Sequence, residues 1–391
     1  MKFNKWTLGL AAVGAVSMAS AVRADETAHL DKLNTALSST TISGYVDVAA
    51  QWNAGDQPQR NAIYVPVGGI SSSVDTGRKV DNFSLNNVTI TLDKPLDESP
   101  WAAGYHVDLN AGQDAFNAFG WDINTGGVST SSTLVGVRQA YVTLRTPVGN
   151  GIDWKIGALD GVTGYEANTG YLNPNYTRSY GYAVNPASMV GLLGNYKICN
   201  EVAVNLGIVN RGTSFGSYGQ NARNLSSKDY VATIAFTAPE SFGFLKGSVL
   251  NLGTVQGFDN NSVNNYSASA TLNTPVTGLK FGLAFDTVQS LVSSVDGNIY
   301  GVYLTYQATD KLSLNLRGEY VDSHWQDLSF FSEGYGRGEE ITTTLEYDMW
   351  ANVVSRLEFR WDHVEQGTQY ATVNGSVANA FQVALNVVYK F

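Results

Sequence analysis

The sequence predicts an all-β protein, a transmembrane antiparallel β-barrel of 16 strands that follows a short N-terminal periplasmic segment. Three observations carry this prediction: a leader typical of exported proteins, long loops that alternate with short turns, and a last strand that ends on an aromatic residue. Charged residues are also sparse, at 15% of the chain, against about 25% in ordinary soluble domains.

The leader has the three parts of a secretory signal peptide. Lys2 and Lys5 give it a positive start, an uncharged apolar stretch follows, and small residues permit cleavage after Ala21 or Ala24. The stretch is too short to span a membrane, and an amphipathic or core helix is the alternative. We expect residues 1–24 to be a cleaved signal peptide, 25–40 a short periplasmic segment that contains a helix, and 41–391 the barrel domain.

Charge and cysteine content exclude two classes of partner or site. The formal net charge is −10, and loss of Lys2, Lys5 and Arg23 with the leader would make it −13. Such an acidic chain is not expected to bind nucleic acid. Cys199 is the single cysteine, which excludes an intramolecular disulfide and a cysteine-based zinc site.

Hydrophobic periodicity places strands along nearly the whole chain. After the leader no segment has 18 consecutive apolar residues, so a membrane-spanning chain would have to cross as a closed barrel. Alternation with a period of two residues indicates strands. The predicted strands are 41–53, 82–93, 102–112, 135–146, 152–160, 189–198, 202–210, 229–238, 244–252, 264–273, 279–288, 298–307, 312–322, 339–349, 353–364 and 379–391.

The connections between these strands differ in length. Those after even-numbered strands are short and rich in turn residues, as in TPVGNG and ATDK, whereas those after odd-numbered strands are mostly long. This asymmetry is typical of outer-membrane barrels, whose short turns face the periplasm. An even number of strands also brings both termini to the short-turn side.

The last segment, FQVALNVVYKF, alternates apolar and polar residues and ends on Phe391. A strand of a soluble sandwich would alternate in the same way, so the leader and the loops decide between the two. An aromatic end matches the signal by which bacterial outer-membrane proteins are recognised, and we interpret Tyr389 and Phe391 as that assembly signal. The expected partners are the barrel-assembly machinery, outer-membrane lipid and lipopolysaccharide.

Strand parity assigns a set of charged residues to the interior of the barrel. Their alternative interpretation is a solvated wall of neighbouring opposite charges that pair with one another, although together they would still shape the field in a pore. The candidates are Asp47, His106, Asp108, Arg145, Lys155, Arg317, Glu319, Glu346, Arg356, Glu358, Arg360 and Asp362.

The loop over residues 161–187 is the third long loop and is rich in Tyr and Asn. We expect it to fold into the interior and form the constriction there; the alternative is an outer loop that packs on its own tyrosines. The constriction candidates are Tyr165, Glu166, Arg178 and Tyr180.

Residues suited to catalysis or metal binding are few. His324 and His363 lie near strand ends beside carboxylates and could form a metal or acid-base site, and the stretch 259–261 could bind calcium. We therefore expect no catalytic residues, no bound metal and no cofactor.

Three stretches of the first half resemble the β-barrel porin-2 families, related to the OprB and OmpL porins. They run over 83–115, 137–166 and 176–196, and include a Lys-Pro turn at Lys94, a Gln-Ala-Tyr strand that leads to Pro-Val-Gly-Asn-Gly, and Gly-Tyr-Glu in the loop. His106 stands where the family pattern would have Arg or another residue. The resemblance covers mainly residues 41–200.

The resemblance implies a passive, water-filled channel for small hydrophilic solutes and ions in the outer membrane of a Gram-negative cell. A substrate-selective channel, for example for carbohydrate, is the second hypothesis, with Tyr141 and Tyr303 as the aromatic residues of the interior. An outer-membrane enzyme or adhesin is the third. By analogy with 16-stranded porins we expect a homotrimer.

Overall fold

The computed structural model describes residues 40–54, 82–112, 135–186, 188–210, 212–214, 217–218, 228–257, 263–290, 295–323, 336–366, 370–372 and 375–391. The expected signal peptide, the helix of the periplasmic segment, His324 and the stretch 259–261 lie outside these residues. No helix of the described part is long and apolar enough to cross a membrane.

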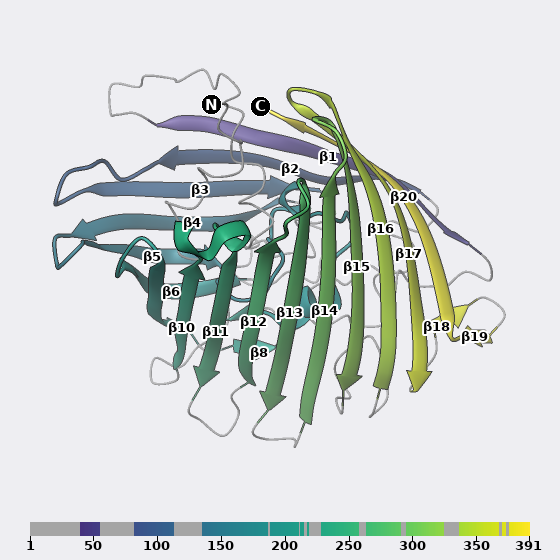
Figure 1. Cartoon of the computed structure of the whole chain (residues 1–391). Coiled ribbons are helices and arrows are strands. Elements are labelled where there is room, and N and C mark those ends of the chain that lie inside the picture. Colours follow the sequence, from purple (N-terminus) through teal and green to yellow (C-terminus); the bar gives the residue numbers. More distant parts are fainter. Residues whose placement is uncertain are drawn as a thin grey trace.

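Sixteen long antiparallel strands form one closed sheet, in which each strand pairs with its neighbour along the chain (Figure 1). The first and last of them pair with each other, from Tyr45 opposite Lys390 to Ala54 opposite Phe381, which closes the barrel. The strands are β1 (Thr41–Ala54), β2 (Asn82–Lys94), β3 (Ala103–Ala111), β4 (Val135–Thr146), β5 (Ile152–Asp160), β6 (Ser188–Lys197), β7 (Val202–Asn210), β10 (Lys228–Thr237), β11 (Val249–Gly257), β12 (Val263–Asn273), β13 (Leu279–Ser290), β14 (Val295–Gln307), β15 (Leu312–Ser323), β16 (Gly336–Trp350), β17 (Val353–Gln366) and β20 (Asn379–Lys390).

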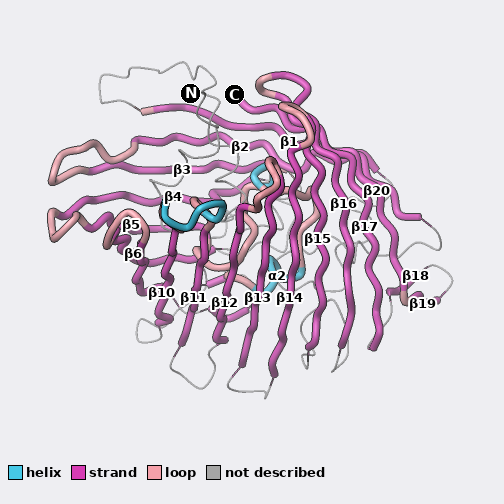
Figure 2. Tube along the Cα trace, viewed as in Figure 1, coloured by secondary structure: helices cyan, strands magenta, loops and turns pink. Residues whose placement is uncertain are grey.

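Short elements occupy some of the connections. The hairpin of β8 (Gly212–Ser214) and β9 (Ser217–Tyr218) adds to β6, and β18 (Tyr370–Thr372) pairs with β19 (Gly375–Val377) in a separate small sheet. The 3₁₀ helices are η3 (Gly170–Leu172) and η4 (Glu240–Leu245), and α2 (Tyr180–Val184) is one helical turn. Figure 2 shows α2 in cyan among the strands.

The predicted fold class and strand number are confirmed, and most strand ends agree within a few residues. The exception is the ninth strand, which was predicted over 244–252 but is β11, from Val249 to Gly257. Phe244 and Leu245 belong to η4 instead. Gly243 and Gly247 have φ of 61° and 74°, a left-handed conformation that turns the chain before the strand can begin.

The two faces of the sheet have the polarity of a membrane barrel. Leu316 on β15 and Phe359 on β17 lie on the outer face and are 40% and 49% exposed, whereas Arg317, the residue after Leu316, is 0% exposed. Outward apolar and inward polar side chains reverse the arrangement of a soluble protein. The parity assignment made from the sequence is therefore correct on these strands.

Phe391 extends the seam that closes the barrel. Its backbone N–H donates to the Gly44 carbonyl and its carbonyl accepts from the Gly44 N–H, both at 2.9 Å. A Cβ atom on Gly44 would lie 2.7 Å from the Phe391 ring, so the glycine leaves the space that the ring uses. Tyr389 and Phe391 are 49% and 42% exposed on the outer face.

Deletion of Phe391 should lower the yield of folded barrel while leaving export intact, because the seam loses both hydrogen bonds to Gly44 and the outward ring. Heat-modifiable migration in SDS gels measures the folded fraction, and cell fractionation measures export. Phe244→Ala removes an aromatic side chain that is 59% exposed in a turn and serves as the control. An unchanged folded fraction after deletion would contradict the role of the terminal residue.

Arginine should be tolerated far better inside the barrel than outside it on the same strand. Leu252 is 45% exposed near the midpoint of β11, and Leu252→Arg should destabilise the folded barrel by about 2–4 kcal/mol. Asn251 lines the interior cavity described below. Asn251→Arg should therefore lower the free energy of unfolding by less than half as much as Leu252→Arg. Urea unfolding in lipid vesicles measures both, and equal losses would show that the facing of β11 is wrong.

Candidate functional site

The connection from β5 to β6 runs through the interior of the barrel. It starts at β5, and its central part contacts β15, β16 and β17 on the wall that lies halfway around the ring of strands. Nearer its start it meets other strands: Arg138 of β4 donates to the Thr169 hydroxyl at 2.9 Å, and Tyr171 packs edge-on against Tyr45 of β1 with ring centroids 4.8 Å apart. We call its described residues, 161–186, the inner loop.

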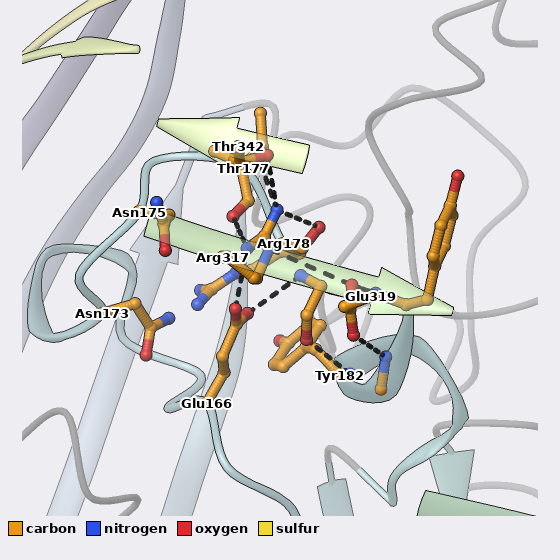
Figure 3. A network of polar contacts seen from close by, with 12 residues as sticks. Glu166, Asn173, Asn175, Thr177, Arg178, Tyr182, Arg317, Glu319 and Thr342 are labelled. Carbon is orange, nitrogen blue, oxygen red and sulfur yellow. Dashed lines mark hydrogen bonds and ion pairs between the residues drawn. The ribbon is translucent and has the colours of Figure 1, made fainter. Parts of the chain in front are cut away.

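Arg317 on β15 is the centre of the contacts that hold the inner loop (Figure 3). Its Nη1 donates to Glu166 Oε1 at 2.8 Å and to the Thr177 carbonyl at 2.7 Å, and its Nη2 lies 2.8 Å from Glu340 Oε2 of β16. The side chains of Arg317, Glu166 and Glu340 are all 0% exposed. One guanidinium thus joins a loop carboxylate, a loop carbonyl and a wall carboxylate.

Two wall carboxylates bind backbone N–H groups of the inner loop. Glu358 on β17 accepts from the amides of Tyr176 and Thr177 at 2.5 and 2.9 Å. Glu319 on β15 accepts from the amides of Tyr180 and Gly181 at 2.6 and 3.0 Å. These charge-assisted bonds satisfy donors that an irregular buried segment would otherwise leave without partners.

Two wall arginines bind the loop carbonyls in the complementary way. Arg356 Nη2 donates to the carbonyls of Tyr171 and Asn173 at 2.7 and 2.9 Å. Arg360 Nη1 donates to the Arg178 carbonyl at 2.6 Å. The wall of the barrel therefore binds the backbone of the inner loop as well as its side chains.

Tyrosines of the inner loop fill the space between loop and wall. Tyr165 stacks on Tyr303 of β14 with ring centroids 4.0 Å apart, and its hydroxyl is 3.2 Å from Thr271. Burial raises the pKa of Tyr165 and that of Tyr182 to about 12, so both phenols keep their protons at neutral pH. Tyr180 is 1% exposed, with its hydroxyl 2.5 Å from Asp362.

A cavity of about 290 Å³ lies on the other side of the inner loop. Its wall comes from β4, β5 and β6 and from β10, β11 and β12, and its remaining side is formed by the first part and the end of the inner loop. Both hydroxyl or amide side chains and apolar side chains line the cavity. Representative lining residues are Tyr141, Lys155, Asp160, Thr233, Asn251 and Ser267.

A polar network continues from this cavity along β2, β3 and β4. Arg138 bridges Asp108 and Asp160, at 3.0 and 3.1 Å. His106 lies 3.2 Å from Asp108 and 2.9 Å from Asp93. The departure from the family pattern at His106 thus places an imidazole between two carboxylates.

The predicted constriction residues all lie in the inner loop, but their side chains contact other protein groups instead of facing the open interior of the barrel. Counted over backbone and side chain together, Glu166 and Arg178 are 6% and 8% exposed. Arg178 donates to the carbonyls of Ala167 and Asn168, and its guanidinium lies 4.5 Å from the centroid of the Tyr182 ring. The narrowing role of Tyr165, Glu166, Arg178 and Tyr180 stays a prediction, and their positions favour anchoring over direct contact with solute.

Apart from Arg145 and His106, the predicted interior charges lie in three places: beneath the inner loop, on the side of the cavity, and, for Asp47, between Asn86 and Asn386. The wall charges of β15, β16 and β17 are covered by the inner loop, and Asp47 accepts from Asn86 and Asn386 at 2.8 and 2.6 Å. Asp108 and Lys155 belong to the side with the cavity. The loop-covered members are Arg317, Glu319, Glu346, Arg356, Glu358, Arg360 and Asp362.

Arg145 differs from the prediction. It pairs with Asp153 at 2.6 Å and donates to the Asp97 carbonyl at 3.0 Å, with 29% of its side chain exposed. These partners place it at the short-turn rim, because β4 ends at Thr146. Strand parity predicted correctly that Arg145 lies on the inward face of β4, but it did not predict that Arg145 lies at the end of the strand.

Sequence reasoning did not single out Glu340, Arg138 and Asp160. Each sits on a strand whose alternation was recognised, and Glu340 shares the inward parity of Glu346 on β16, so parity could have found it. The partner of Glu340, Arg317, is 23 residues away in sequence, and no local pattern indicates such a pairing. His363 lies 2.9 Å from Asn379, and the described residues hold no group of three or more His, Cys, Asp or Glu arranged for a metal ion.

Removal of the Arg317 charge should destabilise the barrel strongly. Arg317→Met leaves Glu166 and Glu340 buried without their cation, and loss of one partner of a buried pair costs about 3–5 kcal/mol. Arg337→Met is the control, because Arg337 and Asp322 pair at 3.3 Å with side chains 41% and 30% exposed, and such pairs contribute about 0–1 kcal/mol. Denaturant unfolding of both variants measures the difference; similar losses would contradict the central role of Arg317.

The comparisons with known proteins agree with this architecture. A family model described as "Putative beta-barrel porin-2, OmpL-like" matches residues 39–391. No curated protein matches the sequence significantly. Three solved structures illustrate the structural likeness, and at their low sequence identity they show the fold alone.

OmpT (in-vitro folded), an outer membrane protein of Vibrio cholerae, has 12% identity and a TM-score of 0.58, over 92% of this chain and 100% of that one. The outer membrane channel DcaP of Acinetobacter baumannii has 10% identity and a TM-score of 0.56, over 90% and 97%. An anion-selective porin from Comamonas acidovorans has 10% identity and a TM-score of 0.55, over 90% and 99%. With the family match over nearly the whole barrel, the chain belongs to the OmpL-like β-barrel porin-2 family and is an outer-membrane channel for passive diffusion.

Proposed function

We propose that the protein is a diffusion channel for small hydrophilic solutes and ions in which the inner loop narrows the pore from one side. The observation that carries this proposal is the asymmetry of the interior. The loop is bound to β15, β16 and β17, whereas a cavity lined by polar side chains remains beside β4, β5, β10 and β11. Solutes would pass on the cavity side.

A carbohydrate-selective channel receives less support from the aromatic residues. Tyr303 is 2% exposed beneath Tyr165, so of the two aromatic residues considered for a sugar track only Tyr141 lines the cavity. One ring cannot form a track. The proposal for solute class is therefore a hydrophilic channel without a sugar track, and it includes no catalytic residue, cofactor or adhesive function.

Export and assembly complete the proposal. The mature chain would begin after Ala21 or Ala24, reach the outer membrane through the barrel-assembly machinery, and contact lipid and lipopolysaccharide with its apolar outer face. A homotrimer is proposed because a solved neighbour, OmpT of Vibrio cholerae, is described in a trimer form at 12% identity and a TM-score of 0.55. Cross-linking in the membrane tests the trimer, and N-terminal sequencing tests the cleavage site.

The purified protein in planar bilayers should give stepwise ion conductance, and vesicles that contain it should swell in small sugars. Loss of the loop anchor in Arg317→Met should enlarge the opening, so that conductance per channel rises and larger sugars enter. Arg337→Met should keep the wild-type conductance, since its pair lies at an exposed position. A wild-type protein without conductance would overturn the channel function, and equal conductance of both variants would overturn the narrowing role of the loop.

A further inference from the structure

We infer that Lys155 selects solutes by charge in this channel and favours the passage of small hydrophilic organic anions. The inference deepens the proposed function, on which it rests, and concerns the cavity beside the inner loop. It comes from the charges that line the cavity: a lysine with no carboxylate at ion-pair distance among the described residues, and two acids that are each paired with an arginine.

Lys155 projects from β5 into this cavity. Its Nζ lies 5.0 Å from the centroid of the Tyr141 ring, which in turn stacks on His106 with centroids 5.1 Å apart. Gly157, opposite Tyr141 on the neighbouring strand, allows the backbone of β4 to approach closely at this point, because a Cβ atom there would lie 2.8 Å from the Tyr141 Cα. The ammonium is thus held over a ring face.

No carboxylate of the described residues lies within ion-pair distance of Lys155, whose ammonium lies over the Tyr141 ring. The two acids that line the cavity are bound elsewhere. Asp160 pairs with Arg138 at 3.1 Å, and Glu166 pairs with Arg317 at 2.8 Å. An incoming anion therefore meets an ammonium that is not in direct contact with a carboxylate of the described residues, although Asp160 lies in the same cavity.

Among the described residues that line the cavity, Lys155 is the one lysine, arginine or histidine, and four arginines nearby in the interior are engaged by other groups. Arg317, Arg356 and Arg360 are 0–2% exposed beneath the inner loop and bind its carbonyls and the wall carboxylates. Arg138 is 7% exposed and lies between Asp108 and Asp160. Lys155 therefore presents the cation that a solute in the cavity can approach.

The surroundings of Lys155 indicate the chemistry of the solute. Thr233, Asn251 and Ser267 line the same cavity, and their hydroxyl and amide groups can exchange hydrogen bonds with hydroxyls of a passing molecule. An ammonium with neutral polar neighbours suits a carboxylate that carries hydroxyl groups. A single cation gives preference without tight binding, which conduction requires.

Reversal potentials in a KCl gradient and vesicle swelling in gluconate or glucose test the inference. Lys155→Ala should lower the chloride-to-potassium permeability ratio several-fold and slow gluconate entry several-fold, with glucose entry within twofold of wild type. Lys155→Glu should reverse the ion preference relative to wild type, and Lys155→Arg should retain it. Lys246→Ala, in the exposed turn where Lys246 pairs with Glu240, is the matched control and should behave as wild type.

The outcomes separate this inference from the proposed function. If the wild type conducts and Lys155→Ala, with normal heat-modifiable migration, keeps its ion preference and gluconate rate, the inference is wrong and the channel stands. If Lys155→Ala does not fold, Lys155→Glu and Lys155→Arg still decide, because equal ion preference of these two variants overturns the inference. A wild type that does not conduct would instead remove the function on which the inference rests.

Discussion

The structure depends on how the barrel wall satisfies the backbone of a long irregular segment buried inside it. Buried amide and carbonyl groups must have partners, and the inner loop has no regular ladder to supply them. Glu319 and Glu358 accept from its amides, while Arg317, Arg356 and Arg360 donate to its carbonyls. The course of the loop is therefore fixed by charged side chains of two strands, β15 and β17.

This anchoring determines which charges remain available inside the barrel. The richest cluster of arginines and carboxylates is paired and removed from water, so it stabilises the loop rather than lining the open space. Burial makes such a cluster sensitive, because a charge that loses its partner cannot return to water without moving the loop. The cavity side, with Lys155 above Tyr141, has fewer charges, and each therefore has more influence on a passing ion.

The barrel itself obeys a simpler constraint. Every strand must pair on both edges, because lipid offers no hydrogen bonds, and the pairing of β1 with β20 completes the ring. Phe391 prolongs that seam through its two bonds to Gly44. Apolar side chains then face outward and polar ones inward along the same strands, which gives a membrane-facing surface and an interior that can hold water.

The sequence by itself determined the fold class, the number of strands and the facing of residues such as Leu316 and Arg317, because these follow from a local period of two and from turn chemistry. It also indicated that the segment 161–187 would enter the interior. It missed the start of β11, where two left-handed glycines override an apolar run. Only the tertiary structure decided that Glu166 joins Arg317, 151 residues away, that Arg145 sits at the rim, and that Lys155 has no carboxylate at ion-pair distance in the part of the chain that the structure describes. Such pairings depend on which strands face each other across a closed barrel, and neither periodicity nor composition contains that information.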